Sequence, residues 1–312
     1  MNRTFFSRTF SSAGQRFVVC AFWLFVSHFT APSLQAQTGL ALLKVEPGAT
    51  VNALGGAAVA LRNESAALAA NPALAGLGAQ PAASFGYNSY WSAITIGNMQ
   101  VSPRVSSVFS GIISVQYAGV SDIEKRTAPT TEPLATFGLN DFNFRLGTAA
   151  RISEKLSIGI AAGFVFEKVD QWRGSAASLD FGAAYQATDY LTLAAAVTQL
   201  GPSFELSAPG QNSSREVKQP TAVRVGGSYQ KEKLLGSGEL ELRDGTTIGK
   251  VGIGYDLVPE FGLRGGFRFG DDSRTFSAGM TAKHDQFELS YAVVPYSNSL
   301  GTAHLLSFGI RW

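Results

Sequence analysis

The chain has 312 residues, with 25 basic and 23 acidic side chains and a formal net charge of +2. Charged residues make up only 15% of it, whereas glycine contributes 34 residues and aromatic side chains contribute 11%. This composition is poor in charge for the surface of a soluble protein, and it leaves no basic field that would attract nucleic acid.

Residues 1–36 have the three parts of a secretory signal peptide. Three arginines precede the apolar run FVVCAFWLFVSHFTA, and the small-residue site SLQA ends at Ala36. The apolar run is short for a membrane-spanning helix, so cleavage is favoured over retention as an anchor. The mature chain would keep 22 basic against 23 acidic residues, a net charge of −1, and would lose Cys20, the single cysteine. A disulfide framework or a thiolate metal site is then excluded.

Residues 37–80 form a small-sided, almost uncharged segment that includes GGAAVALRNESAALAANPALAGLG, from Gly55 to Gly78. The polar residues 63–65 can cap a short helix over residues 65–70. Asn71-Pro72 then ends that helix, because the residue before a proline is pushed out of the α region. The segment is too short to form its own core, so we expect it to act as a hatch in the lumen or periplasmic mouth of the structure that follows.

From residue 81 onward the chain divides into alternating segments of about 9 to 12 residues, the length of a tilted outer-membrane strand. In the stretch 261–270, phenylalanine and leucine, with Gly265, occupy one face, and glycine and arginine the other. A soluble sandwich would place its charges on the outward face, whereas here charges share a face with glycines. The pattern therefore favours an all-β, antiparallel transmembrane barrel over a soluble sandwich or propeller.

Fourteen strands are predicted, near 81–89, 92–101, 106–122, 139–152, 156–169, 176–186, 190–200, 220–231, 236–243, 248–257, 261–269, 274–283, 286–295 and 302–312. Their connections alternate between tight turns and longer loops, as periplasmic turns and outer loops do in such barrels. The long loops are predicted at Lys125–Gly138, Gly201–Pro220 and from Val294. The last strand ends with Phe308, Ile310 and Trp312 on one face, which resembles the closing strand that the barrel assembly machinery recognises.

Several motifs resemble the PorV/PorQ family of outer-membrane proteins, which is itself similar to FadL-like transporters. NALGGAAVALRNESAALAANPALAGL, from Asn52 to Leu77, is similar to the family's N-terminal signature. FGYNSYWSAITIGNMQV, FGLNDFNFRLGTAARISEKLSIGIAAGFVFEKV and the ending VVPYSNSLGTAHLLSFGIRW resemble its strands. The resemblance implies a fourteen-stranded barrel with an N-terminal hatch, serving type IX protein secretion or cell-surface attachment. The chain lacks the large loop insertion of PorV-like members, which puts direct cargo binding in doubt.

Two groups of candidate residues follow, one in the hatch and one on the lumen face of the strands. Asn71-Pro72-Ala73, with Gly55 and Gly56, would either lock the hatch or gate a channel. The inward charges would either pair with one another and with the hatch or line a selective pathway; they are Arg145, Arg151, Asp180, Arg224, Arg264, Arg268, Glu288 and Arg311, together with Glu239 and Glu241.

The sequence gives no reason to expect an enzyme, a cofactor or a metal site. His284 and His304 are the two histidines of the mature chain, and neither has carboxylates at metal-ligand spacing. The predicted function is a non-enzymatic secretion or attachment component, with outer-membrane lipid, the barrel assembly machinery and secretion components or cargo as partners. The alternative is a FadL-like transporter of hydrophobic small molecules, and a third possibility is a soluble periplasmic β-protein.

Overall fold

The computed structural model describes residues 40–312, apart from residues 79, 91–93, 130, 211–213 and 298–299. The predicted signal peptide and the first three residues of the predicted hatch lie outside the described residues. Across the described ranges the chain forms sixteen strands and four short helices. No helix in this part of the chain is both long and apolar enough to cross a membrane.

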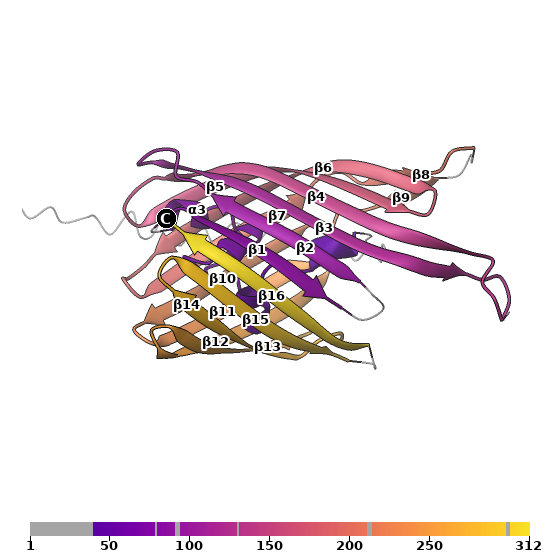
Figure 1. Cartoon of the computed structure of the whole chain (residues 1–312). Helices are drawn as coiled ribbons and strands as arrows, with labels where there is room; N and C mark the ends of the chain where they lie inside the picture. Colours follow the sequence, from indigo (N-terminus) through magenta and orange to yellow (C-terminus); the bar gives the residue numbers. More distant parts are fainter. Residues whose placement is uncertain (1–39, 79, 91–93, 130, 211–213, 298–299) are drawn as a thin grey trace, which may run out of the picture. The chain divides into compact units, whose positions relative to one another are not determined.

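Fourteen of the described strands form a closed antiparallel barrel, which confirms the predicted fold class (Figure 1). The sheet closes because β1 pairs with β16 and β5 pairs with β6. The barrel strands are β1 (Ala82–Ser89), β2 (Thr95–Ser102), β3 (Phe109–Lys125), β4 (Ala135–Arg151), β5 (Leu156–Val169), β6 (Trp172–Gln186), β7 (Leu191–Leu200), β10 (Ala222–Lys231), β11 (Leu234–Arg243), β12 (Thr246–Val258), β13 (Phe261–Phe269), β14 (Phe276–His284), β15 (Phe287–Tyr296) and β16 (Gly301–Arg311).

All three of the predicted long loops are partly strand, which corrects the sequence prediction. The loop predicted from Val294 begins only after Tyr296, where β15 ends. The stretch Gly201–Pro220 contains a hairpin of β8 (Phe204–Ser207) and β9 (Ser214–Val217), which we call the outer hairpin. Its prolines suggested a loop, but they flank the two strands rather than interrupt them. The ladder between β3 and β4 likewise continues past an irregularity at Val120/Ile123, so the connecting loop is only residues 126–134.

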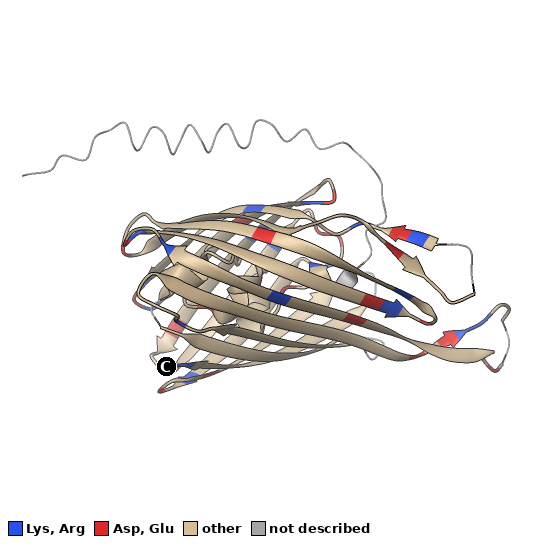
Figure 2. Ribbon diagram, turned by 90° about the horizontal axis from the view of Figure 1, so that it is seen from above, with Lys and Arg blue, Asp and Glu red and all other residues tan. Residues whose placement is uncertain are grey.

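The two faces of the barrel wall differ as the alternation predicted. Large apolar side chains on the outside are exposed, for example Phe267 at 40% and Ile253 at 62%. Charged side chains on the inside are buried, for example Arg145 at 4% and Lys250 at 1% exposure. Figure 2 accordingly shows long uncharged stretches of wall interrupted by single charged positions. An apolar exterior around a polar interior is the arrangement of an outer-membrane barrel.

The two ends of the barrel are different (Figure 1). The tight turns and the C-terminus lie at one end, which we call the turn end, and the long β3–β4 and outer hairpins project at the other, the loop end. In outer-membrane barrels the short turns and the chain ends face the periplasm.

The described hatch, residues 40–78, lies inside the barrel. It contains η1 (Ala41–Lys44), α2 (Ala49–Ala53), η2 (Ser65–Ala69) and α3 (Leu74–Leu77). The helix predicted over residues 65–70 is the 3-10 helix η2, and the Glu64 carboxylate caps it by accepting a bond from the Ala66 N–H at 3.2 Å. Helix α2 packs against β13 to β16, and α3 packs against β3 to β6, so the hatch bridges opposite sides of the wall.

Candidate functional site in the barrel lumen

A buried cluster of charges lies where β11, β12 and β13 face the hatch. Glu239, Lys250 and Arg268 are direct partners across these three neighbouring strands, so the register itself places them side by side. The Lys250 Nζ lies 3.1 Å from Glu239 Oε1 and 2.6 Å from Glu241 Oε2. Arg224 of β10 approaches the same two carboxylates at 3.1 Å each. Such buried charges are tolerated because each one has partners of opposite sign.

Glu46 connects the hatch to this cluster. Its carboxylate lies 2.8 Å from Lys250 Nζ, 2.8 Å from Arg268 Nη2 and 2.5 Å from Arg274 Nη2. Burial by itself would raise the pKa of Glu46, but Arg268, Lys250 and Arg274 together hold that pKa well below its usual range. Glu46 is therefore an ionised carboxylate that joins the hatch to three cations of the wall.

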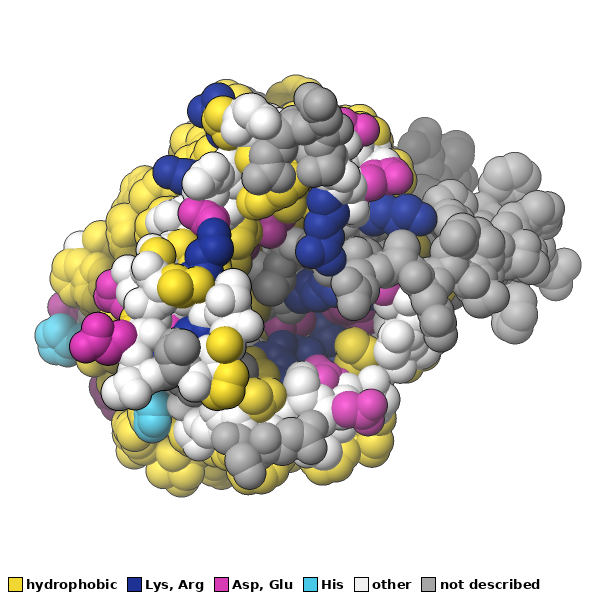
Figure 3. Space-filling view, turned by 90° about the vertical axis from the view of Figure 1, so that its right-hand side faces the viewer, with side chains coloured by type: hydrophobic (Ala, Val, Ile, Leu, Met, Phe, Trp, Pro, Cys, Tyr) yellow, Lys and Arg dark blue, Asp and Glu magenta, His cyan; other side chains and the backbone are white. Residues whose placement is uncertain are grey.

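The hatch backbone also contributes to the cluster. Glu239 Oε2 accepts bonds from the Ala58 and Val59 N–H groups, both at 2.8 Å. Asn52 donates to the Glu46 and Gly48 carbonyls at 2.7 and 2.8 Å, and this fixes the loop that carries the Glu46 carboxylate. Figure 3 views the loop end, where the surface is hollowed and Lys, Arg, Asp and Glu side chains form the floor of the hollow.

A second contact forms around Asn71, which is fully buried. Its Nδ2 donates to the Val59 carbonyl at 2.9 Å and to the Ala183 carbonyl of β6 at 3.2 Å. Its Oδ1 accepts a bond from the Ala73 N–H at 2.9 Å. One carboxamide thus ties two parts of the hatch to each other and to the wall. The role of Asn71-Pro72-Ala73 as a lock or a gate stays a prediction.

Glycines of the wall make room for the hatch at this contact. A Cβ at Gly182 would overlap Asn71 Oδ1, and one at Gly159 would lie 2.5 Å from Ala73 N. Across the lumen, Gly266 and Gly252 receive Leu54 and Gly55 in the same way. These strand glycines therefore mark where hatch backbone approaches wall backbone.

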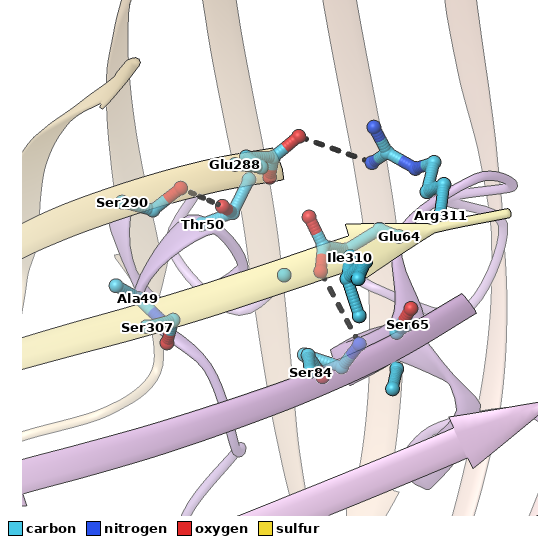
Figure 4. Close-up of a pocket in the computed structure, with 13 residues that line it drawn as sticks. Ala49, Thr50, Glu64, Ser65, Ser84, Glu288, Ser290, Ser307, Ile310 and Arg311 are labelled. Atoms are coloured by element: carbon cyan, nitrogen blue, oxygen red, sulfur yellow. Dashed lines mark hydrogen bonds and ion pairs between the residues drawn. The ribbon is translucent and has the colours of Figure 1, made fainter. Parts of the chain in front are cut away.

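The predicted inward charges all face the interior. Arg224, Arg268, Glu239 and Glu241 belong to the buried cluster, and the others make separate contacts. Arg145 pairs with Asp180 at 2.5 Å and donates to the Ala69 carbonyl at 3.0 Å. Arg264 pairs with Asp256 at 2.6 Å. At the turn end, Arg311 pairs with Glu288 at 3.0 Å (Figure 4) and donates to the Asn63 carbonyl at 2.8 Å, while Arg151 Nε donates to the Gly76 carbonyl at 2.8 Å.

Sequence reasoning missed four members of the buried cluster: Glu46, Arg243, Lys250 and Arg274. Two of them carried a usable signal. Lys250 shares its face of β12 with two glycines, which is the inward pattern, and Glu46 is one of the few acidic residues in an almost uncharged hatch. Arg274 lies in the loop after β13, where the alternation of a strand does not predict which way a side chain points.

The wall is irregular between β6 and β7, near the loop end. The register shifts between Leu179 and Phe181, so that two residues of β7 face Asp180. One of them, Gln199, has a left-handed backbone with φ of 59°, and its N–H donates to Asp180 Oδ1 at 2.6 Å. Beyond Leu200 the outer half of β6 loses β7 as a partner, and the outer hairpin covers it through a single bridge, Arg173 to Ser207.

An apolar cluster lies on the inner side of this break. Its members come from the start of the hatch, from β5 and β6, and from the outer hairpin; they are Leu40, Leu43, Val165, Ala176, Phe204, Leu206 and Val217, with Trp172 packed against them. Gln199 Nε2 donates to the Leu43 carbonyl at 3.0 Å, which joins the cluster to the break.

The remaining candidate residues lie on the outside. His284 is the exposed last residue of β14, and His304 of β16 accepts from or donates to the Tyr291 hydroxyl at 2.7 Å on the exposed surface. The described residues contain no group of three potential metal ligands among histidine, cysteine, aspartate and glutamate. Phe308 and Trp312 point outward, and the role of the last strand in assembly stays a prediction.

Comparison with solved structures finds the same barrel fold in proteins whose sequences are only 10 to 15% identical to this chain. The toluene transporter TbuX of Ralstonia pickettii is 15% identical with a TM-score of 0.63, and the alignment covers 85% of this chain and 98% of that one. The toluene transporter TodX of Pseudomonas putida is 11% identical with a TM-score of 0.63, covering 85% and 97%. A Pseudomonas aeruginosa FadL homologue is 10% identical with a TM-score of 0.57, covering 85% and 97%. No family model and no curated protein sequence matches the chain.

Proposed function

We propose that the chain is a non-enzymatic outer-membrane barrel that lets an apolar small molecule enter through the break between β6 and β7. The observation that carries the proposal is that an interrupted wall lies directly beside a buried apolar cluster. The structural neighbours that share the fold include toluene transporters. The proposed organisation is a signal peptide over residues 1–36, a hatch over 37–80 and a barrel over 81–312.

The outer hairpin would open the route. It joins β6 through one backbone bridge, and Gln219 Nε2 spans the gap by donating to the Ala177 carbonyl at 2.8 Å and the Pro202 carbonyl at 3.1 Å. These few bonds are weaker than a continuous ladder. Separation of the hairpin would expose the apolar cluster, and a guest would gain about 25 cal/mol for each Å² of apolar surface it buries there.

The test is uptake of an isotope-labelled monoaromatic hydrocarbon by vesicles that contain the purified protein. Uptake above that of protein-free vesicles, together with exclusion of a hydrophilic sugar of similar size, supports the proposal. Equal uptake with and without the protein would overturn it. Because the hatch and the buried charge cluster occupy this part of the lumen, we expect the sugar to pass far more slowly than the hydrocarbon.

A second candidate is a component of type IX secretion or of cell-surface attachment, as the resemblance to the PorV/PorQ family suggests. The observation that favours it is the hatch itself, which Glu46 and Asn71 fix to opposite sides of the wall. A barrel with such a fixed hatch can serve as a scaffold, with the β3–β4 and outer hairpins as protein-binding surfaces at the loop end.

Crosslinking in native outer membranes, followed by affinity purification and mass spectrometry, tests this second candidate. Crosslinks from residues 126–134 to secretion components or cargo would support it. Crosslinks limited to the barrel assembly machinery, combined with hydrocarbon uptake by the purified protein, would contradict the second candidate and support transport.

A further inference from the structure

A row of polar side chains, which we call the polar row, crosses the outside of the barrel wall at the loop end. Asn140 of β4, Lys168 of β5 and Arg173 of β6 are direct partners in neighbouring ladders. Ser207 of the outer hairpin is in turn the partner of Arg173. Lys168 and Arg173 are exposed, whereas Glu167 beside Lys168 is buried in the interior, so the row lies on the outer face. Strands are about 4.8 Å apart, which makes the row about 14 Å long.

Two cations occupy the centre of the polar row. Lys168 and Arg173 lie directly opposite each other, and like charges in that position destabilise a sheet. Within the described part of the chain, neither side chain has an ion-pair or hydrogen-bonding partner. The nearby turn carboxylate Asp170 lies 3.4 Å from Lys125 instead. An anion between the two cations would therefore remove their repulsion.

The wall on the turn-end side of these cations is aromatic. The next row of direct partners holds Tyr117, Phe142 and Phe166, and the row after it pairs Phe144 with Phe164. These rings face outward; Tyr117 and Phe164, for example, are each 46% exposed. In outer-membrane barrels, girdles of aromatic side chains mark the level at which the hydrocarbon meets the lipid headgroups. Lys168 and Arg173 therefore lie beside the headgroups.

The polar row presents hydrogen-bond donors suited to a phosphate. The Tyr117 hydroxyl donates to Asn140 Oδ1 at 2.5 Å, which leaves the Nδ2 group of that carboxamide as a donor for a ligand. The guanidinium fork of Arg173 matches two phosphate oxygens, and the Lys168 ammonium adds a second charge. Hydrogen bonds between such cations and a phosphate are roughly twice as strong as neutral ones.

We propose that the polar row binds the phosphate of a membrane lipid, with Lys168 and Arg173 around the phosphate and the acyl chains against Phe164 and Phe166. The charge of the phosphate complements the two cations, and the exposed rings provide the apolar surface that the chains need. A free phosphate would use the cations and leave the rings without a partner. The site lies outside the lumen, so the inference does not depend on the proposed transport function.

The test measures lipid retention by the purified protein in detergent, using native mass spectrometry. Equal amounts of phosphatidic acid and of diacylglycerol with the same acyl chains are added, and we expect roughly tenfold greater retention of phosphatidic acid. The double variant Lys168→Gln/Arg173→Gln should lose this preference. The matched control Lys155→Gln/Lys231→Gln removes the same charge from exposed positions at the turn end and should keep it.

Lys168→Arg guards against misfolding, because it changes the side chain but keeps the charge; we expect it to retain the preference for phosphatidic acid. Equal retention of the two lipids by the unmodified protein would overturn the inference, as would an undiminished preference in the double variant. Glycerol 3-phosphate separates a lipid from a free phosphate. If it displaces phosphatidic acid at equal concentration, the site takes a free phosphate and the assignment to a lipid is wrong.

Discussion

The hatch is held to the two sides of the barrel by different kinds of contact. Near Glu46 the hatch is held by long side chains that reach from β12, β13 and the loop after β13 to one carboxylate. Near Asn71 it is held by backbone and a short carboxamide that fit against wall glycines. The contact at Glu46 depends on balanced charge, and the contact at Asn71 depends on the absence of side chains on the wall glycines. Different substitutions should therefore disrupt the two contacts.

Removal of the Glu46 charge should have the largest effect. Glu46→Gln leaves three buried cations short of a counterion, and breaking a buried ion pair typically costs 3–5 kcal/mol. We expect about 3 kcal/mol, because Lys250 keeps Glu239 and Glu241. The cost corresponds to a roughly hundredfold faster exchange of hatch amides, measured by hydrogen exchange with mass spectrometry.

Glu154→Gln, in an exposed turn, is the matched control and should leave hatch exchange unchanged. If both variants exchange at the same rate, the ionic contact does not hold the hatch.

A methyl group at Gly182 should have the next largest effect. Gly182→Ala places a Cβ against Asn71 Oδ1, and overpacking of this kind costs about 1–3 kcal/mol. The expected result is faster exchange in residues 70–78 with little change around Glu46. Gly97→Ala is the control, since a Cβ at Gly97 meets nothing within 4 Å. A uniform loosening of the whole hatch would show that the two contacts are not separate.

A third test of the hatch uses pH. Burial and the neighbouring Glu288 raise the pKa of Glu64 in the folded chain to about 7, above its unfolded value near 4.3, so the folded chain holds this proton more tightly. This contribution to stability is complete below pH 4 and is lost as the pH rises to about 7. The temperature at which the barrel shifts in a detergent gel should therefore fall between pH 5 and pH 8. Glu64→Gln should flatten that dependence, and an unchanged slope would contradict it.

Much of the fold follows from periodicity, because lipid outside and polar groups inside impose an alternation of two along each strand. Phe267 and Arg268 show it directly: one is exposed and the other is buried. The outer hairpin was missed because its strands are four residues long and flanked by proline, so too few alternations exist to recognise. The glycines of the wall were visible, but pairing Gly182 with Asn71 requires a fold that joins residues far apart in the chain.

The candidate site was only partly visible for the same reason. Arg145 and Asp180 could be assigned to the inner face, yet their pairing depends on two strands, β4 and β6, that flank β5. The break between β6 and β7 rests on one extra residue and the left-handed Gln199, and glutamine carries no sequence signal for that conformation.

The most direct test of the proposed route is a reversible lock on the outer hairpin. Cysteines at Arg173 and Ser207, which are partners in the bridge between β6 and β8, can form a disulfide, and the mature chain has no other cysteine if Cys20 is removed with the signal peptide. Cysteines at Glu205 and Glu216 would crosslink the hairpin only to itself and serve as the control. Oxidation of the cysteine pair at positions 173 and 207 should stop hydrocarbon uptake and reduction should restore it, while the control keeps its uptake. Full uptake by the oxidised protein with cysteines at positions 173 and 207 would contradict the proposed route.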